Sequence, residues 1–136
     1  MAPPIAEVRV RWKAGLQFEG SGAGRPPLLT DGDAGVATSP VELLLVAAAS
    51  CTASDIVLIL RKQRVALEAL EVHVRGTRRE TEPRRFTAIA FQFTVRGQGA
   101  DEPKVRRAID LSLEKYCSVI ASLAPDISLG YDVTIA

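Results

Sequence analysis

The sequence of 136 residues contains few of the side chains from which metal and cofactor sites are usually built. Its single histidine (His73) and two cysteines (Cys51 and Cys117) are too few ligands for a zinc or iron site of the usual kind, so we expect neither metal nor cofactor. The net charge is +1, from 17 basic and 16 acidic residues. A field of that size does not concentrate nucleic acid or anionic lipid, so we expect neither nucleic acid nor a membrane as a partner.

Long uninterrupted apolar runs are also lacking. The most apolar segment, 41–60, contains Glu42 and Asp55, and its uncharged stretch has 12 residues, short of the roughly 20 needed to cross a bilayer. We interpret the segment as a buried central helix. The N-terminus lacks the basic patch and apolar run of a secretory signal. We therefore expect a cytoplasmic protein, in which a cysteine pair is more often catalytic than structural.

Ordinary globular composition, with 47% hydrophobic and 24% charged residues, predicts one domain over residues 1–136. Apolar residues alternate with arginines in 8–12, which predicts a half-buried strand. A turn at Ala14-Gly15 and a second strand beginning at 16–18 complete a hairpin, and a third short strand is expected at 28–30.

A helix is predicted from Ser39 to about Arg64. Ser39 and Glu42 form a capping-box pattern, and Pro40 suits the first helical position. The middle of the helix, 47–54, consists of small residues. Such a surface allows another backbone to approach closely, so we expect a second helix to pack there.

The rest of the chain predicts an α+β fold. Two long strands around 70–75 and 89–95 are followed by a helix that begins near 101–103. Residues Val105, Ile109, Leu113 and Tyr116 recur at helical spacing toward Cys117. A last strand at 127–135 alternates cleanly. The order indicates two helices packed against antiparallel-rich sheets.

The two cysteines have two interpretations. Free cysteines are often small buried hydrophobes. Alternatively, a thiolate attacks the O–O bond of a peroxide, becomes sulfenic acid, and condenses with the second thiol. A cysteine must be ionised for this attack, and Cys51 lies about three turns into its helix, beyond the reach of the helix dipole. The best candidate for an activating cation is Arg25, which follows a Gly-rich loop; the alternative is a solvated surface arginine.

Three motifs carry a resemblance to a known family. They are Ser39-Pro40-x-Glu42 with Ala48-Ala49-x-Cys51, Phe86-Thr87-x-Ile89, and Leu111-Ser112-x-Glu114-Lys115-Tyr116-Cys117-Ser118-Val119. From residue 8 to 135 the chain resembles the OsmC/Ohr superfamily (osmotically induced protein C and organic hydroperoxide resistance), in its OsmC-like, YhfA-like branch. The resemblance implies an intertwined homodimer with two central helices. It also implies a metal-free thiol peroxidase with no cofactor.

The roles that the resemblance implies are peroxidatic for Cys51 and resolving for Cys117. The implied substrate is an organic hydroperoxide, and the implied reductant is a dithiol, a lipoyl-protein in some relatives. Ohr-type members have a glutamate ten residues before the first cysteine, where this chain has Val41. Glu42 is nine residues before Cys51 and therefore lies about 180° from it, on the opposite side of the helix. This position favours a capping role for Glu42 over a catalytic one. Glu114, three residues before Cys117, is a candidate to orient Arg25 in its place.

Two functions from different classes follow. The first is a thiol-dependent peroxidase in oxidative-stress defence. The second is a non-catalytic homodimer that binds a hydrophobic small molecule or senses redox state. Peroxide-dependent disulfide formation with turnover separates them.

Overall fold

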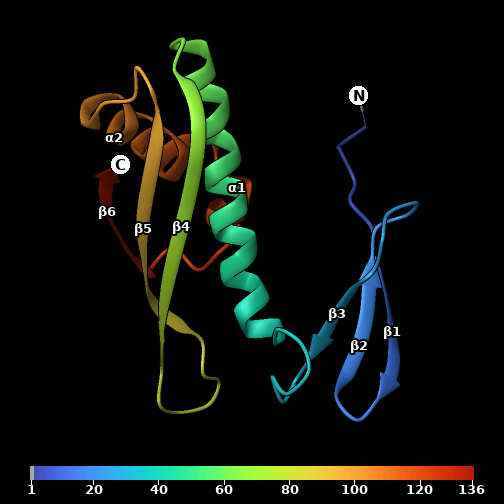
Figure 1. The fold of residues 1–136 in the computed structure, drawn as a ribbon. Helices are drawn as coiled ribbons and strands as arrows, with labels where there is room; N and C mark the ends of the chain where they lie inside the picture. Colours follow the sequence, from blue (N-terminus) through green and yellow to red (C-terminus); the bar gives the residue numbers. More distant parts are fainter. Residues whose placement is uncertain (1) are drawn as a thin grey trace. The chain divides into compact units, whose positions relative to one another are not determined.

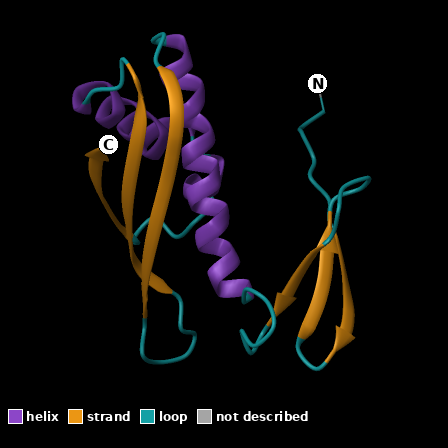
Figure 2. Cartoon of the chain, viewed as in Figure 1, coloured by secondary structure: helices purple, strands orange, loops and turns teal. Residues whose placement is uncertain are grey.

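The computed structural model describes residues 2–136 and divides them into two compact units, residues up to Leu44 and Leu45–Ala136. The predicted α+β class, with antiparallel-rich sheets, is confirmed (Figures 1 and 2). That residues 1–136 form one domain stays a prediction.

The first unit is a three-stranded antiparallel sheet in the order β1-β2-β3. Its strands are β1 (Arg9–Ala14), β2 (Gln17–Ser21) and β3 (Leu28–Asp31), at the three positions that the sequence predicts. The indole N–H of Trp12 donates to the carbonyl oxygen of Gly15 at 2.9 Å and braces the first turn. Gly15 has φ 54° there, which a residue without Cβ adopts readily.

The predicted half-burial of the first strand is wrong for this chain alone. Val10 and Trp12 are 66% and 64% exposed, and all of β1 is exposed. Within residues 2–44 no second layer covers the apolar face that the alternation produces, so both faces of the strand meet solvent.

The loop after β3 is organised by the buried Asp31. Its carboxylate accepts hydrogen bonds from the backbone N–H groups of Asp33, Gly35 and Val36 at 2.9, 3.1 and 3.0 Å. These bonds lower the pKa of Asp31 because they favour the charged carboxylate, and the bond from Val36 has the largest effect. The loop leads directly into the first helix.

Helix α1 (Pro40–Lys62) begins as predicted. Ser39 N–H donates to Glu42 Oε1 at 3.0 Å, and Glu42 N–H donates to Ser39 Oγ at 3.2 Å, which completes the capping box. The helix ends two residues before the expected Arg64, because Arg64 adopts φ 60°. Val65 N–H then bonds to the Leu60 carbonyl at 3.0 Å and closes the helix end.

One stripe of α1 is fully buried: Ala48, Thr52, Ile56 and Leu60. By length and composition alone, its 23 residues would suffice to cross a membrane, and 22% of the most apolar window is buried. A core helix meets the same criterion, and the buried stripe is typical of one. The absence of a membrane partner stays a prediction.

The second unit contains a three-stranded sheet in the order β4-β5-β6 (Figure 1). Strands β4 (Ala66–Arg78) and β5 (Phe86–Gln98) are antiparallel, as consecutive long strands should be. Strand β6 (Ser128–Ile135) pairs with β5 in parallel. The parallel pairing follows from the helical connection between them, since a parallel neighbour requires a crossover.

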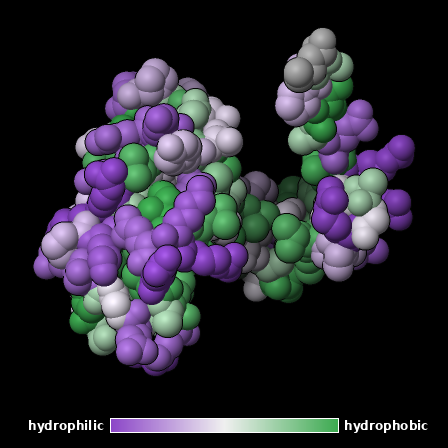
Figure 3. All heavy atoms as spheres, turned by 90° about the horizontal axis from the view of Figure 1, so that it is seen from above, coloured by the Kyte–Doolittle hydropathy of each residue, from purple (hydrophilic) through white to green (hydrophobic). Residues whose placement is uncertain are grey.

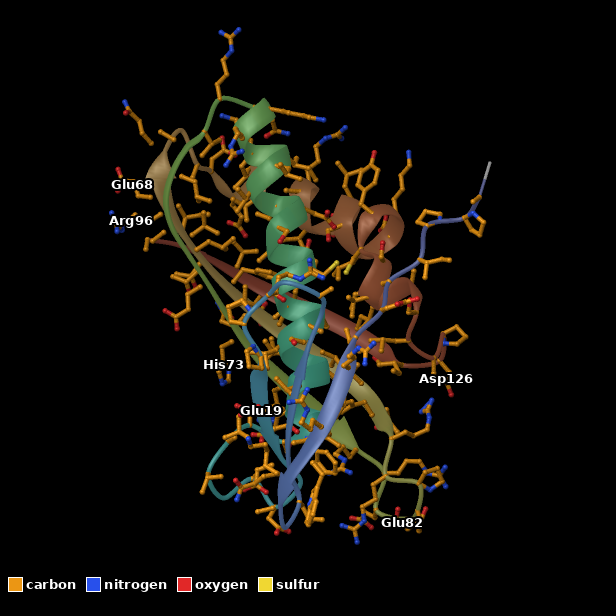
Figure 4. The ribbon with its side chains drawn as sticks, turned by 90° about the vertical axis from the view of Figure 1, so that its right-hand side faces the viewer. Glu19, Glu68, His73, Glu82, Arg96 and Asp126 are labelled. Carbon is orange, nitrogen blue, oxygen red and sulfur yellow. The ribbon has the colours of Figure 1, made fainter. Side chains whose placement is uncertain are left out.

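Only one face of β5 is fully buried, by Phe91, Phe93 and Val95. This pattern agrees with helices on one side of the sheet, where α1 and α2 (Glu102–Leu111) lie (Figures 1 and 4). The other side is polar. His73 projects from it on β4, and the ion pair of Arg96 and Glu68 lies near the strand ends (Figure 4).

Candidate functional site

Three side chains of α1 provide the first half of the candidate site. Cys51 and Asp55 are half-buried, and Thr52 is fully buried. They occupy positions i, i+1 and i+4, so they lie close together on the helix surface. The small residues around them leave space for a second segment of chain to approach.

That second segment follows α2 and differs from the prediction. Residues Ser112–Tyr116 form one turn of π-helix, η1, and Cys117 has an extended backbone with φ −74° and ψ 105°. Cys117 caps the short helix α3 (Ser118–Ala121). The prediction that Cys117 terminates a continuous helix is therefore wrong.

The wide turn also changes which residues face inward. Cys117 N–H bonds to the Ser112 carbonyl at 2.8 Å, five positions back, and both residues are buried. Tyr116, expected on the apolar stripe of a helix, is 50% exposed. The extra residue per turn rotates it outward.

Two side-chain contacts join this segment to α1. The Thr52 hydroxyl donates to Cys117 Sγ at 3.6 Å, although the two residues are 65 positions apart. The Ser112 hydroxyl donates to Asp55 Oδ2 at 2.8 Å. Asp55, which the sequence left without a role, thus has a hydrogen-bond partner for its half-buried carboxylate.

The environment of Cys117 raises the pKa of its thiol. Burial is the largest cause, because it penalises the charged form. The N–H of Ile120, 3.4 Å from the sulfur, and the Thr52 hydroxyl act in the opposite direction. The neighbouring Cys51 raises the pKa of the Cys117 thiol further. The two cysteines, from different elements, are therefore near each other.

The other predicted site residues belong to other segments of the chain. Arg25 belongs to the first unit, where its backbone N–H donates to the Gly22 carbonyl at 3.2 Å. Glu42 is in the capping box, and Glu114 is exposed. The structure does not test a role for any of the three. His73 is exposed on β4 (Figure 4).

Sequence reasoning missed Thr52 and gave Ser112 no role of its own. The available signal was the presence of a hydroxyl in an otherwise apolar stretch, since such a group needs a partner once buried. The partner could not be named because both contacts span the tertiary fold. Among residues 2–136 no three His, Cys, Asp or Glu side chains gather in an arrangement that could hold a metal ion.

Comparisons with known proteins agree with this fold. The model of the OsmC-like protein family matches residues 31–132. Protein YhfA of Escherichia coli strain K12 is 44% identical over 133 residues, which cover 96% of this chain and 99% of YhfA. A hypothetical protein from Aquifex aeolicus VF5 has a similar crystal structure, with a TM-score of 0.87, 27% identity, and coverage of 98% and 99%.

A more distant structure carries a functional name. The organic hydroperoxide resistance protein OhrB of Bacillus subtilis aligns with a TM-score of 0.63 and 17% identity, covering 96% of this chain and 98% of OhrB. At that identity the likeness shows a shared fold.

Proposed function

The chain belongs to the OsmC-like protein family, and from that premise we propose that it is a thiol-dependent peroxidase that reduces organic hydroperoxides. In this proposal Cys51 is the peroxidatic cysteine and Cys117 the resolving one. The name of the distant relative OhrB, an organic hydroperoxide resistance protein, suggests the substrate class.

The observation that carries the proposal is the unequal pair of thiols. Cys51 is half-buried, so a substrate can reach it, whereas Cys117 is 3% exposed. The proximity of the two cysteines, which belong to different elements, supports direct condensation between them. Two inert core cysteines would need no such arrangement.

The chemistry divides between the two sulfurs. The Cys51 thiolate attacks the O–O bond, and the departing alkoxide takes a proton to become an alcohol, which leaves a sulfenic acid on Cys51. Cys117 then displaces the hydroxyl, forming a disulfide and water. A dithiol reductant restores both thiols. Resolution by a nearby thiol protects Cys51 from irreversible oxidation.

Two further residues enter the proposal with supporting roles, and a third does not. Arg25 is proposed to stabilise the Cys51 thiolate and the developing alkoxide, and Glu114 to orient its guanidinium. Glu42 is assigned to the capping box rather than to the reaction, because its carboxylate already accepts the Ser39 N–H. Arg25→Ala should slow the reaction with peroxide, and Arg25→Lys should slow it less.

The central test is peroxide consumption with dithiothreitol as the dithiol. Wild-type protein should consume tert-butyl hydroperoxide faster than hydrogen peroxide, and Cys51→Ser should consume neither. Cys117→Ser should react once and then over-oxidise at Cys51. Absence of turnover in the wild type would instead favour the non-catalytic, small-molecule-binding or redox-sensing homodimer.

We further propose that the protein is a cytoplasmic homodimer that acts in oxidative-stress defence. Large apolar side chains of α1 support the assembly: Leu44, Val46 and Leu58 are 39%, 53% and 53% exposed in the single chain. Hydrophobic side chains reach the surface between hydrophilic ones in Figure 3. A second copy of the chain would cover exposed apolar side chains of this kind.

A further inference from the structure

Thr52 uses its hydroxyl differently from the other hydroxyl residues around it on α1. Ser50 and Ser54 donate to the carbonyl oxygens of Val46 and Ser50, one turn earlier, each at 2.8 Å. Thr52 instead donates to the sulfur of Cys117. Because Thr52 is fully buried, water cannot replace this partner.

The sulfur of Cys117 is held as an acceptor from two directions. Thr52 donates from α1, and the backbone N–H of Ile120 donates from α3. The Cys117 N–H bond to the Ser112 carbonyl fixes the backbone, and the Ser112 hydroxyl is itself bonded to Asp55 on α1. Donors directed at a sulfur favour its charged form, which burial otherwise disfavours.

We propose that Thr52 is a positioning residue for Cys117, whose hydroxyl stabilises the thiolate of this buried sulfur at the two steps in which it carries the negative charge. The inference rests on the proposed function, in which Cys117 resolves the oxidised Cys51. It adds a residue of this chain that acts through the second cysteine rather than on the peroxide.

The first of these steps is resolution. The Cys117 thiol releases its proton, and the thiolate attacks the sulfur of the Cys51 sulfenic acid. The S–S bond forms as the S–O bond breaks, and the departing hydroxide combines with the released proton as water. The Thr52 hydroxyl stabilises the attacking thiolate.

The second step is reduction of the disulfide. A thiolate of the dithiol attacks the more accessible sulfur of Cys51, the S–S bond breaks, and its electron pair passes to Cys117. The second thiol of the reductant then displaces the Cys51 thiolate from the mixed disulfide, leaving the reductant oxidised. The Thr52 hydroxyl stabilises Cys117 as the leaving group, and a more stable thiolate leaves faster.

The test begins from the isolated disulfide form and measures its opening by dithiothreitol. Thr52→Val should open about tenfold more slowly, the effect expected for loss of a hydrogen bond to a charged group. Thr52→Ser, which keeps the hydroxyl, should stay near the wild-type rate. With tert-butyl hydroperoxide, Thr52→Val should also accumulate more sulfinic acid on Cys51, because Cys117 resolves the sulfenic acid more slowly.

Equal opening rates for Thr52→Val and wild type would overturn the proposal, and so would a Thr52→Ser protein as slow as Thr52→Val. If the valine variant does not fold, Thr52→Ser and Thr52→Ala form the matched pair, since both lack the methyl group and only serine keeps the hydroxyl; equal rates there also overturn it. A wild type that consumes no peroxide overturns the proposed function alone, because opening by dithiothreitol needs no peroxide.

Discussion

Cys117 and Cys51 differ most clearly in burial, and this difference predicts their order of alkylation. Because burial raises the pKa of Cys117, less of it is thiolate at any given pH. Brief iodoacetamide treatment of the reduced protein at pH 7 should therefore label Cys51 first. Labelling of Cys117 should rise only above the ordinary thiol pKa of about 8.5.

Mass spectrometry of the labelled protein measures both sites at once. Cys51→Ser serves as the control, since Cys117 should stay unlabelled at pH 7 without its neighbour. Guanidinium-unfolded protein should label at both positions. Faster labelling of Cys117 than of Cys51 in the folded protein at pH 7 would contradict the assigned environments.

At the scale of an element, the start of α1 depends on its capping box. Ser39→Ala removes the acceptor of the Glu42 N–H, and loss of such a cap costs about 1 kcal/mol of unfolding free energy. Urea denaturation measures the loss. Ser50→Ala, an exposed change in the same helix, should leave stability nearly unchanged.

The capping box also has a pH dependence with a definite sign. The Ser39 N–H, and then its hydroxyl, lower the pKa of Glu42 because they favour the carboxylate. A lowered pKa adds stability above the unfolded value of about 4.3, and this stability is lost as the pH falls through the folded value. The difference in unfolding free energy between wild type and Glu42→Gln should thus shrink below about pH 4. A difference that grows there would contradict the assignment.

The contact between α1 and β4 depends on a residue without a side chain. A Cβ on Gly76 would lie 2.4 Å from Phe86 Cε1 and 3.1 Å from Leu45 Cδ2, so Gly76→Ala overpacks this junction. Such changes cost about 1–3 kcal/mol. Gly130→Ala in β6 is the matched control, because a Cβ there meets nothing within 4 Å. Thermal unfolding should show a lower melting temperature for Gly76→Ala than for Gly130→Ala. An equal loss of stability in both variants would rule out overpacking as the cause.

At the scale of the whole molecule, the exposed apolar residues of α1 predict a homodimer. Sedimentation at micromolar concentration should show a dimer, and Leu58→Glu should shift it toward monomer by placing a charge in the covered face. Thr81→Glu, in the exposed connection between β4 and β5, is the control. A monomeric wild type would contradict the assembly.

Local sequence patterns determined much of this protein. The alternation in β1 and β5, the capping box and the turn at Gly15 each depend on neighbours along the chain, so these elements were predictable. The sequence also indicated the family, and it identified both cysteines as candidate site residues. The predicted half-burial of β1 was wrong, because alternation along the chain does not show whether a second layer packs on the apolar face.

Tertiary packing decided the rest. The π-helical turn, which removes Cys117 from a regular helix and turns Tyr116 outward, has no periodicity that a sequence pattern reveals. The parallel pairing of β6 and the contact between Thr52 and Cys117 join residues far apart in the chain. Such contacts form only when the free energy of burial exceeds the entropy lost in closing long loops, a balance set by the whole fold.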